Sequence, residues 1–167
     1  MNVAPSPVLT LTATQSDAGS VQASLQEIYD EISAATLGWE TAVDVEDLES
    51  ALYSQDWVFI DSNKQLHSWQ QVREEGGLPV QKPALTWVAQ TIQKLSLTPE
   101  GAAAVVNMST VRTVVDREGR YGRRGASHSV TETTTFRDRW IAGPDGWKMK
   151  SREQLGRFIV AVDRRSS

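Results

Sequence analysis

The sequence has no cysteine, only two histidines and no long apolar run. Without cysteine there are no disulfides, thiolate nucleophiles or cysteine metal ligands, so any chemistry must use oxygen or imidazole groups. His67 and His128 are 61 positions apart, a spacing that indicates no zinc or iron site, so we expect no metal. No apolar run approaches the roughly 18 residues that a membrane helix needs, so we expect no membrane partner.

Glycine-rich cofactor motifs are also missing. The stretch "GRYGRRGA", residues 119–126, lacks the lysine and the following helix of a phosphate loop, and there is no dinucleotide fingerprint or nucleophile elbow. We therefore expect no cofactor. The stretch itself is basic and flexible, so it is either a lid that clamps an anionic group through Arg123 or Arg124, or a solvated loop, which we favour.

Length and composition indicate one domain. The chain has 167 residues, 40% hydrophobic and 23% charged, which suits a single core. We expect residues 1–19 to be a flexible segment and residues 20–163 to be the folded unit. The first residues lack a basic n-region and the apolar block of a signal peptide, which favours the cytoplasm, although an exported protein with its leader removed would look similar.

Charge is unevenly placed along the chain. Residues 1–111 hold 4 basic and 14 acidic groups, a net of −10, and residues 112–167 hold 13 basic and 7 acidic groups, a net of +6. A basic half is sometimes a nucleic-acid surface. Here the basic residues alternate with acidic and apolar ones along apparent strands, so we expect a solvated or self-associating sheet face and no nucleic acid.

Two helices are predicted before the first strand. From Val21 to Trp39, apolar residues recur every three or four positions, the spacing of one helical face. Asp44 then precedes "VEDLESALY" as an N-cap, with Asp47 as a weak capping-box match. A strand, "DWVFID", and a turn, "DSNK", follow this second helix.

A third, short helix is predicted after that turn. Ser68 and Gln71 form a capping box that opens "WQQVREE", and Gly76-Gly77 ends the helix. Long β-rich runs follow at residues 84–97, 102–116, 127–142 and 146–155, separated by turn formers, which predicts an antiparallel meander. Residues 157–162, "RFIVAV", continue the last strand past a bulge at Gly156.

This order of elements defines an α+β domain with three N-terminal helices packed on one face of a curved antiparallel sheet. "LESALYSQDWVFIDSNKQLHSWQQV" (48–72) and "FRDRWIAGPDGWKMKSREQL" (136–155) together resemble the nuclear transport factor two-like superfamily, and within it the SnoaL-like group. The resemblance covers nearly the whole chain. It implies a cone-shaped (cystatin-like) fold, a pocket between the helices and the concave sheet, and a homodimer formed through the sheet.

Asp61 is the main functional candidate. In this resemblance it lies where ketosteroid isomerases keep their proton-abstracting aspartate, and a carboxylate in an apolar pocket has a raised pKa that suits a general base. The alternative is that Asp61 accepts bonds from the amides of its own turn, which we favour. The first-helix tyrosine of that family aligns near Leu37-Gly38, so the oxyanion donor has no counterpart here.

His128 lies on a strand whose alternate residues include Glu132, Phe136 and Trp140. This side is the more apolar, so we expect it to face the helices and to place His128 and Glu132 at the pocket. Scytalone dehydratase, which the chain also resembles through the superfamily, pairs histidines with acids, so His128 is the predicted acid–base partner of Asp61. A solvated His128 is the alternative. His67 is predicted to lead into the third helix without a ligand role.

Six tryptophans are available to line a pocket. Core packing explains them equally well, and we assign Trp147 to the closing hairpin. The predicted ligand-binding residues besides Glu132 are Tyr29, Trp57, Trp69, Trp87 and Trp140, with Trp39 as a further lining candidate.

The predicted function is therefore a small-molecule-binding domain. Its ligand would be a hydrophobic or planar organic molecule, and its reaction a cofactor-free isomerisation, cyclisation or dehydration by proton transfer, with Asp61 and His128 as catalytic residues. The alternative is a non-catalytic ligand-binding or protein-interaction domain, dimeric through its sheet. Fold alone does not decide between them.

Overall fold

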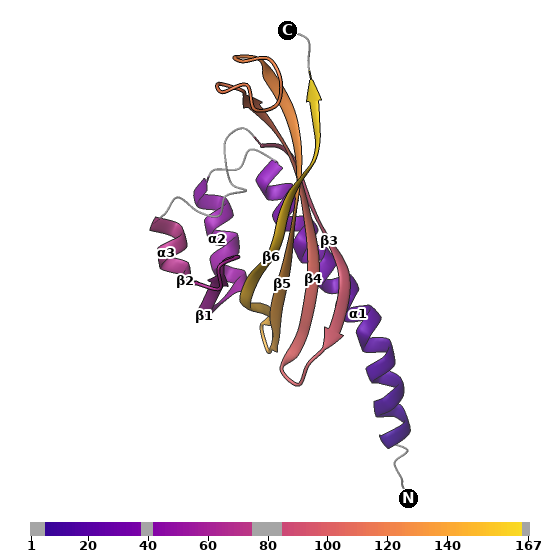
Figure 1. The fold of residues 1–167 in the computed structure, drawn as a ribbon. Coiled ribbons are helices and arrows are strands. Elements are labelled where there is room, and N and C mark those ends of the chain that lie inside the picture. The colour runs from indigo at the N-terminus through magenta and orange to yellow at the C-terminus, as the bar shows by residue number, and fades with distance from the viewer. Residues whose placement is uncertain (1–5, 38–41, 75–84, 165–167) are drawn as a thin grey trace, which may run out of the picture.

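A six-stranded sheet is the centre of the described residues, 6–37, 42–74 and 85–164 of the computed structural model. Its strand order is β2-β1-β6-β5-β4-β3. Figure 1 shows α1 crossing one face of the long strands β3 to β6, with α2 and α3 beside β1 and β2. The elements are α1 (Ser6–Leu37), α2 (Ala42–Leu52), β1 (Tyr53–Ile60), β2 (Leu66–Ser68), α3 (Trp69–Glu74), β3 (Leu85–Leu97), β4 (Gly101–Val115), β5 (Ser127–Gly143) and β6 (Gly146–Arg164).

The sheet confirms the predicted meander, because β3, β4, β5 and β6 pair in sequence order and antiparallel. It is not antiparallel throughout. Strand β1 lies parallel to β6, with Val58 opposite Ser151 and Ile60 opposite Glu153. The short strand β2 pairs antiparallel to β1 and was not predicted, since three residues carry too little pattern to register as a strand.

The description of three N-terminal helices is corrected, because the three helices do not all precede the sheet. Helices α1 and α2 precede β1, and α3 follows β2, in the order in which the sequence placed them. The β1–β2 hairpin comes before α3, and its second strand runs directly into the capped start of that helix. Helix α1 begins at Ser6 and therefore includes residues 6–19, which were expected to belong to a flexible segment. The extent of the domain stays a prediction, and the predicted helix end at Gly76-Gly77 lies outside the described residues.

Helix α1 is tied to the edge strand β3 by one glutamine. Gln26 Nε2 donates to the carbonyl of Gln90 at 2.7 Å, and Gln26 Oε1 accepts from the amide of Ile92 at 2.9 Å. A sheet edge offers unpaired backbone groups, which these two bonds satisfy locally. The pair of bonds therefore fixes the height of α1 on the sheet and the place of Tyr29, less than one turn further along the helix.

The face of the sheet that packs against the helices, here called the inner face, carries the β5 residues that alternation predicted to be buried. Trp140 is 1% exposed and His128 2% exposed, whereas Arg137 and Arg139 on the other face are exposed. The core joins this face to residues of α1, β1 and α3. The buried residues of the predicted β5 face are His128, Val130, Glu132, Thr134, Phe136, Asp138 and Trp140.

Strand β6 runs without a break from Gly146 to Arg164, which confirms that "RFIVAV" continues it. Its register against β5 shifts at three places. One shift leaves Leu155 as the extra residue, next to the bulge predicted at Gly156. Another leaves Lys150 as the extra residue, because Ser151 lies opposite Arg139 and Met149 opposite Trp140. Bulges on this strand thus decide which residues face inward.

Candidate functional site

A buried network of polar side chains lies between α1 and the sheet. Asp138, with 0% exposure, accepts two 2.8 Å bonds from Arg152, one from Nε and one from Nη2. The hydroxyl of Tyr29 donates to Asp138 Oδ2 at 2.5 Å and accepts from Nε1 of Trp140 at 2.9 Å. Burial, and then the neighbouring Asp138 charge, raise the pKa of Tyr29 well above its ordinary value, so the hydroxyl stays protonated as a donor.

Arg152 holds a positive charge inside the domain. Burial works against that charge, but the Asp138 carboxylate outweighs it and the pKa of Arg152 is raised. Its Nη2 also donates to Gln90 Oε1 at 2.8 Å, and its Cζ lies 4.2 Å from the centre of the Phe136 ring. Bidentate carboxylate binding and ring stacking both suit a guanidinium group. The side chain is therefore held in one orientation on the inner face.

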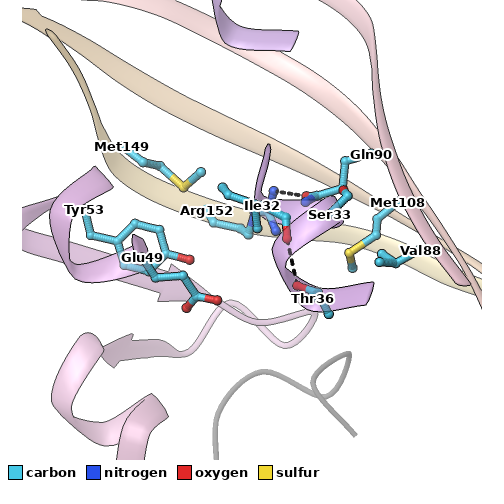
Figure 2. A pocket seen from close by; sticks show the side chains of 10 residues that line it. All are labelled: Ile32, Ser33, Thr36, Glu49, Tyr53, Val88, Gln90, Met108, Met149 and Arg152. Carbon is cyan, nitrogen blue, oxygen red and sulfur yellow. Dashed lines mark hydrogen bonds between the residues drawn. The ribbon is translucent and has the colours of Figure 1, made fainter. Parts of the chain in front are cut away.

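A small cavity lies beside Arg152 (Figure 2). Its volume is about 30 Å³, room for one or two water molecules. In Figure 2, Glu49 and Tyr53 approach from one side of Arg152, and Gln90, Met108 and Val88 lie on the other. The residues that line it are Ile32, Ser33, Thr36, Glu49, Tyr53, Val88, Gln90, Met108, Met149 and Arg152. This cavity is mixed in polarity and has no tryptophan in its wall, unlike the apolar pocket predicted from the sequence.

Glu49 and Tyr53 bring a second polar pair to the cavity wall. Both side chains are buried, at 3% and 9% exposure, and they are hydrogen-bonded to one another. Burial first, and then the Glu49 charge, raise the pKa of Tyr53 well above its ordinary value. With Arg152, the wall thus presents a guanidinium, a carboxyl and a phenol within a low-dielectric region, where electrostatic interactions are strong.

The predicted tryptophans pack the core instead of lining the cavity. Trp57 stacks on Tyr53 with ring centres 4.3 Å apart, and Trp69 meets both rings edge-on at 4.9 and 5.6 Å. Trp140 is buried against Tyr29. Trp87 is 44% exposed on the outer face. Trp39 lies outside the described residues. Aromatic packing of this kind accounts for Trp57, Trp69 and Trp140 without a ligand.

Asp61 is at the turn between β1 and β2, where it accepts bonds from the amides of Asn63 at 2.8 Å and Gln65 at 2.9 Å. This is the turn role predicted from the sequence. Its other oxygen, Oδ2, lies 2.8 Å from Nε2 of His67. The bond from His67, followed by the amide of Gln65, lowers the pKa of Asp61 below its ordinary value. The carboxylate is therefore ionised at neutral pH, and its partner is a histidine that the sequence analysis set aside.

Asp61 and His128 are not brought together. Ile60 is in register with Glu153 and, through it, with Arg137, whereas His128 is at the opposite end of β5. At about 3.3 Å per residue, the two predicted catalytic residues are separated by on the order of 25 Å along the sheet. The tertiary pairing of strands, which the sequence did not reveal, is the reason.

His128 is buried at 2% exposure, so it is neither solvated nor at the described cavity. Its Nε2 is 3.6 Å from Oδ2 of Asp116, and within the described residues neither ring nitrogen makes a hydrogen bond. Desolvation opposes the charge of Asp116, but the amides of Tyr121 and Arg120 outweigh it and lower the pKa of that carboxyl. Asp116 thus anchors the loop after β4, with His128 packed beneath it.

Glu132, predicted as a ligand-binding residue, is enclosed by two arginines. It is 6% exposed, accepts from Arg157 Nη2 at 2.8 Å and Nε at 3.1 Å, and also binds Arg112. The carboxylate is thereby engaged on both oxygens. Its role in the structure is to bind two guanidinium groups on the inner face and to balance the charge of one of them, which no local sequence signal indicated.

One row of cross-strand neighbours connects the polar groups on the inner face. His67 pairs with Phe59, Phe59 with Arg152, and Arg152 with Asp138. Side chains opposite one another on paired strands point to the same face. His67 and Arg152 are thus two strand spacings apart, about 10 Å. The ring of Phe59 lies between them, 6.1 Å from the imidazole. We call His67, Phe59, Arg152 and Asp138 the cross-sheet row.

Metal and membrane features are limited in the described residues. No group of three or more Asp, Glu and His side chains there is placed to hold a metal ion. No helix in the same residues combines the length and apolarity needed to span a membrane. The groups that the described site offers for chemistry are the imidazole, carboxylates, phenols and guanidinium given above.

Comparison with solved structures identifies the fold. The chain is similar to a nuclear transport factor 2 (NTF2-like) superfamily protein from Salmonella enterica subsp. enterica serovar Typhimurium str. LT2, with a TM-score of 0.53, 14% identity, and coverage of 83% of this chain and 92% of that one. It is also similar to a hexachlorocyclohexane dehydrochlorinase (LinA) Type2, with a TM-score of 0.54, 11% identity, and coverage of 92% and 97%.

A second LinA structure gives a TM-score of 0.53 and 12% identity over 91% of this chain and 94% of that one. No protein-family model and no curated protein match the sequence. At these identities the comparisons establish the fold alone. The chain has the NTF2-like fold, with α+β architecture and a curved, mostly antiparallel sheet, as the resemblance predicted.

Proposed function

We propose that the domain binds a small organic molecule at the partly exposed His67–Asp61 pair, outside the small cavity beside Arg152, and transfers a proton within it, with His67 and Asp61 as the acid–base pair. The observation that carries this proposal is the 2.8 Å contact between His67 Nε2 and Asp61 Oδ2 at the end of the cross-sheet row. His67 takes the place that the sequence analysis gave to His128. The reaction class remains an isomerisation, cyclisation or dehydration that needs no cofactor.

The protonation states follow from the hydrogen bonds. Asp61 has a lowered pKa and is ionised near neutrality, so it can only accept a hydrogen bond. Nε2 of a neutral His67 must then carry the proton, which leaves Nδ1 with the lone pair of a base. A proton taken from a carbon or hydroxyl of the ligand by Nδ1 is returned to another ligand atom. Asp61 stabilises the imidazolium that exists between these two steps.

The Arg152–Asp138 ion pair supplies the electrostatic part of the proposal. It lies about 10 Å from His67, two strand spacings along the cross-sheet row. Because Asp138 balances the guanidinium charge, the pair acts as a fixed dipole, and its guanidinium end favours a ligand that becomes negative when its proton leaves. One solved protein of the same fold is a hexachlorocyclohexane dehydrochlorinase, so this fold accommodates a reaction in which a substrate loses a hydrogen.

The test is exchange of ligand protons with solvent deuterium. A panel of cyclic ketones and hydroxyketones is incubated with the protein in D₂O, and exchange at carbon is followed by NMR. His67→Gln and Asp61→Asn should lower the exchange rate by about 100-fold or more. Asp56→Asn, an exposed carboxylate that binds Ser54 on the same strand, is the matched control and should leave the rate unchanged. Equal exchange in wild type and His67→Gln would reject the acid–base proposal.

A second candidate is the non-catalytic domain that dimerises through its sheet. It is supported by Trp87, which is 44% exposed on the outer face and lies opposite Val111 on β4. Large apolar groups on a sheet face favour association of two copies. Sedimentation velocity of the wild type and of Trp87→Lys tests this: a dimer lost in the variant supports it, and a wild type that stays monomeric at high concentration rejects it.

A further inference from the structure

A hollow on the outer face of the sheet lies opposite the inner-face site. The bulge in β6 shapes it, because the inserted residue Lys150 separates Met149, which is buried, from Ser151, which shares the face of Arg139. Two consecutive side chains, Lys150 and Ser151, are thereby directed to the outer face. A regular strand would have sent one of them inward.

Three basic residues surround this hollow. Arg137 and Arg139 are two positions apart on β5 and share the outer face. With Lys150 they line a hollow of about 460 Å³ and an adjoining one of about 280 Å³. The larger hollow has one acidic residue in its wall, Glu100. Its lining therefore carries an excess of positive charge in a protein whose net charge is −4.

The ion pairs around the hollow leave one cation available. Arg137 binds Glu153 at 3.3 Å, and Lys150 is 3.6 Å from Glu100, whose side chain is 66% exposed. Within the described residues, Arg139 has no hydrogen bond or ion pair from its side chain. Exposed ion pairs are weak, so an incoming anion can displace Glu100 from Lys150 at little cost.

Apolar groups form another part of the wall. Pro99, Ala103 and Ile141 line the larger hollow next to the basic residues. Its volume falls in the range of small-molecule sites, about 300–1,000 Å³, which combine an apolar surface with a few polar groups. We propose that this hollow binds an amphipathic anion, with its apolar body on Pro99, Ala103 and Ile141 and its carboxylate or phosphate held by Arg139 and Lys150.

This site is separate from the proposed proton transfer, since it is on the other face of the sheet and shares no residue with the cross-sheet row. We choose an anion with an apolar body because the guanidinium of Arg139, which has no ion-pair partner in the described residues, lies in the same hollow as an apolar wall. A carboxylate or phosphate binds arginine in the same way, so both are tested.

The experiment is a titration of the isotope-labelled full chain with octanoate, octyl phosphate and octanol, followed by amide NMR and calorimetry. We expect both anions to shift the amides of Ala103 and Ile141 and to bind at least about tenfold more tightly than octanol, because a hydrogen bond to a charged group is lost in the alcohol. Tighter binding of octyl phosphate than of octanoate would identify phosphate as the preferred group, and the reverse would identify carboxylate.

The variant Arg139→Gln/Lys150→Gln should weaken anion binding at least about tenfold and leave octanol unchanged. Both side chains are exposed, so a thermal melt should show a folded variant. Arg117→Gln, an exposed arginine in the loop after β4, is the matched control and should bind like the wild type. Three results would overturn the proposal: equal binding of octanoate and octanol, an unchanged affinity in the double variant, or a dimer that covers Arg139 and is dissociated by the double variant.

Discussion

Neighbouring residues of β5 and β6 form two ion pairs in opposite environments. On the inner face, Arg152 binds Asp138 through two 2.8 Å bonds, and the side chains are 6% and 0% exposed. One residue along each strand, on the outer face, Arg137 binds Glu153 at 3.3 Å, and the side chains are 47% and 18% exposed. The two pairs use the same strands and the same kinds of group, and differ in burial and geometry.

This difference sets what each pair contributes. Removal of two charges from water costs several kcal/mol per ion, so the inner pair adds little to net stability but is expensive to break on one side only. The outer pair stays hydrated, is screened by salt and contributes about 0–1 kcal/mol. The inner pair therefore acts as a fixed electrostatic feature of the site, and the outer pair is free to exchange partners.

The largest expected effect comes from removing one inner partner. Arg152→Met should lower the free energy of unfolding by about 3–5 kcal/mol, because it leaves Asp138 buried and unpaired. Urea unfolding followed by tryptophan fluorescence measures this. The double variant Arg152→Met/Asp138→Asn removes both charges, keeps an acceptor for Tyr29 and should recover part of the loss. A loss below about 1 kcal/mol in the single variant would show that breaking the inner ion pair costs no more than breaking the outer one, and would contradict the contrast between them.

A smaller effect is expected for Tyr29→Phe. The change removes the donor to Asp138 and leaves Nε1 of Trp140 without its acceptor, at a cost of about 1–3 kcal/mol. The thermal midpoint of unfolding reports it. A variant as stable as the wild type would show that water replaces the hydroxyl, and that the inner face is wetter than the described contacts imply.

The fall of the free energy of unfolding at acid pH should report the contribution of the Asp61 carboxylate. Its folded pKa is lowered, so its contribution is present above the ordinary aspartate pKa of about 3.9 and is lost as pH falls through the folded value. Asp61→Asn should therefore be less stable than wild type at pH 7, with the two converging as the pH falls to about 3. Chemical denaturation from about pH 3 to neutrality measures the gap. A gap that is constant with pH would exclude the carboxylate charge as its origin.

The smallest effect is expected on the outer face. Glu153→Gln should cost about 0–1 kcal/mol, because Lys64 and Arg137 lower the pKa of Glu153 only through hydrated contacts. Added salt should reduce the difference between variant and wild type. The midpoint of urea unfolding at two ionic strengths checks both points, and a cost near that of Arg152→Met would contradict the contrast between the faces.

Much of the fold was predictable because its signals are local. Alternation placed His128, Glu132 and Trp140 on the buried face of β5, and turn formers separated the strands of the meander. The turn role of Asp61 followed from the residues around it. His67 was missed because β2 has three residues, too few for a strand pattern. Had residues 66–68 been recognised as a strand, the hairpin register would have placed His67 beside Phe59.

The sequence by itself determined the types of element, their order and the buried side of β5, since these depend on the spacing of side chains along one segment. The tertiary structure alone decided that Asp61 and His128 lie apart, and that Arg152 faces inward while Lys150 faces out. These outcomes depend on the parallel pairing of β1 with β6 and on bulges in β6, which fix the register between residues far apart in the chain.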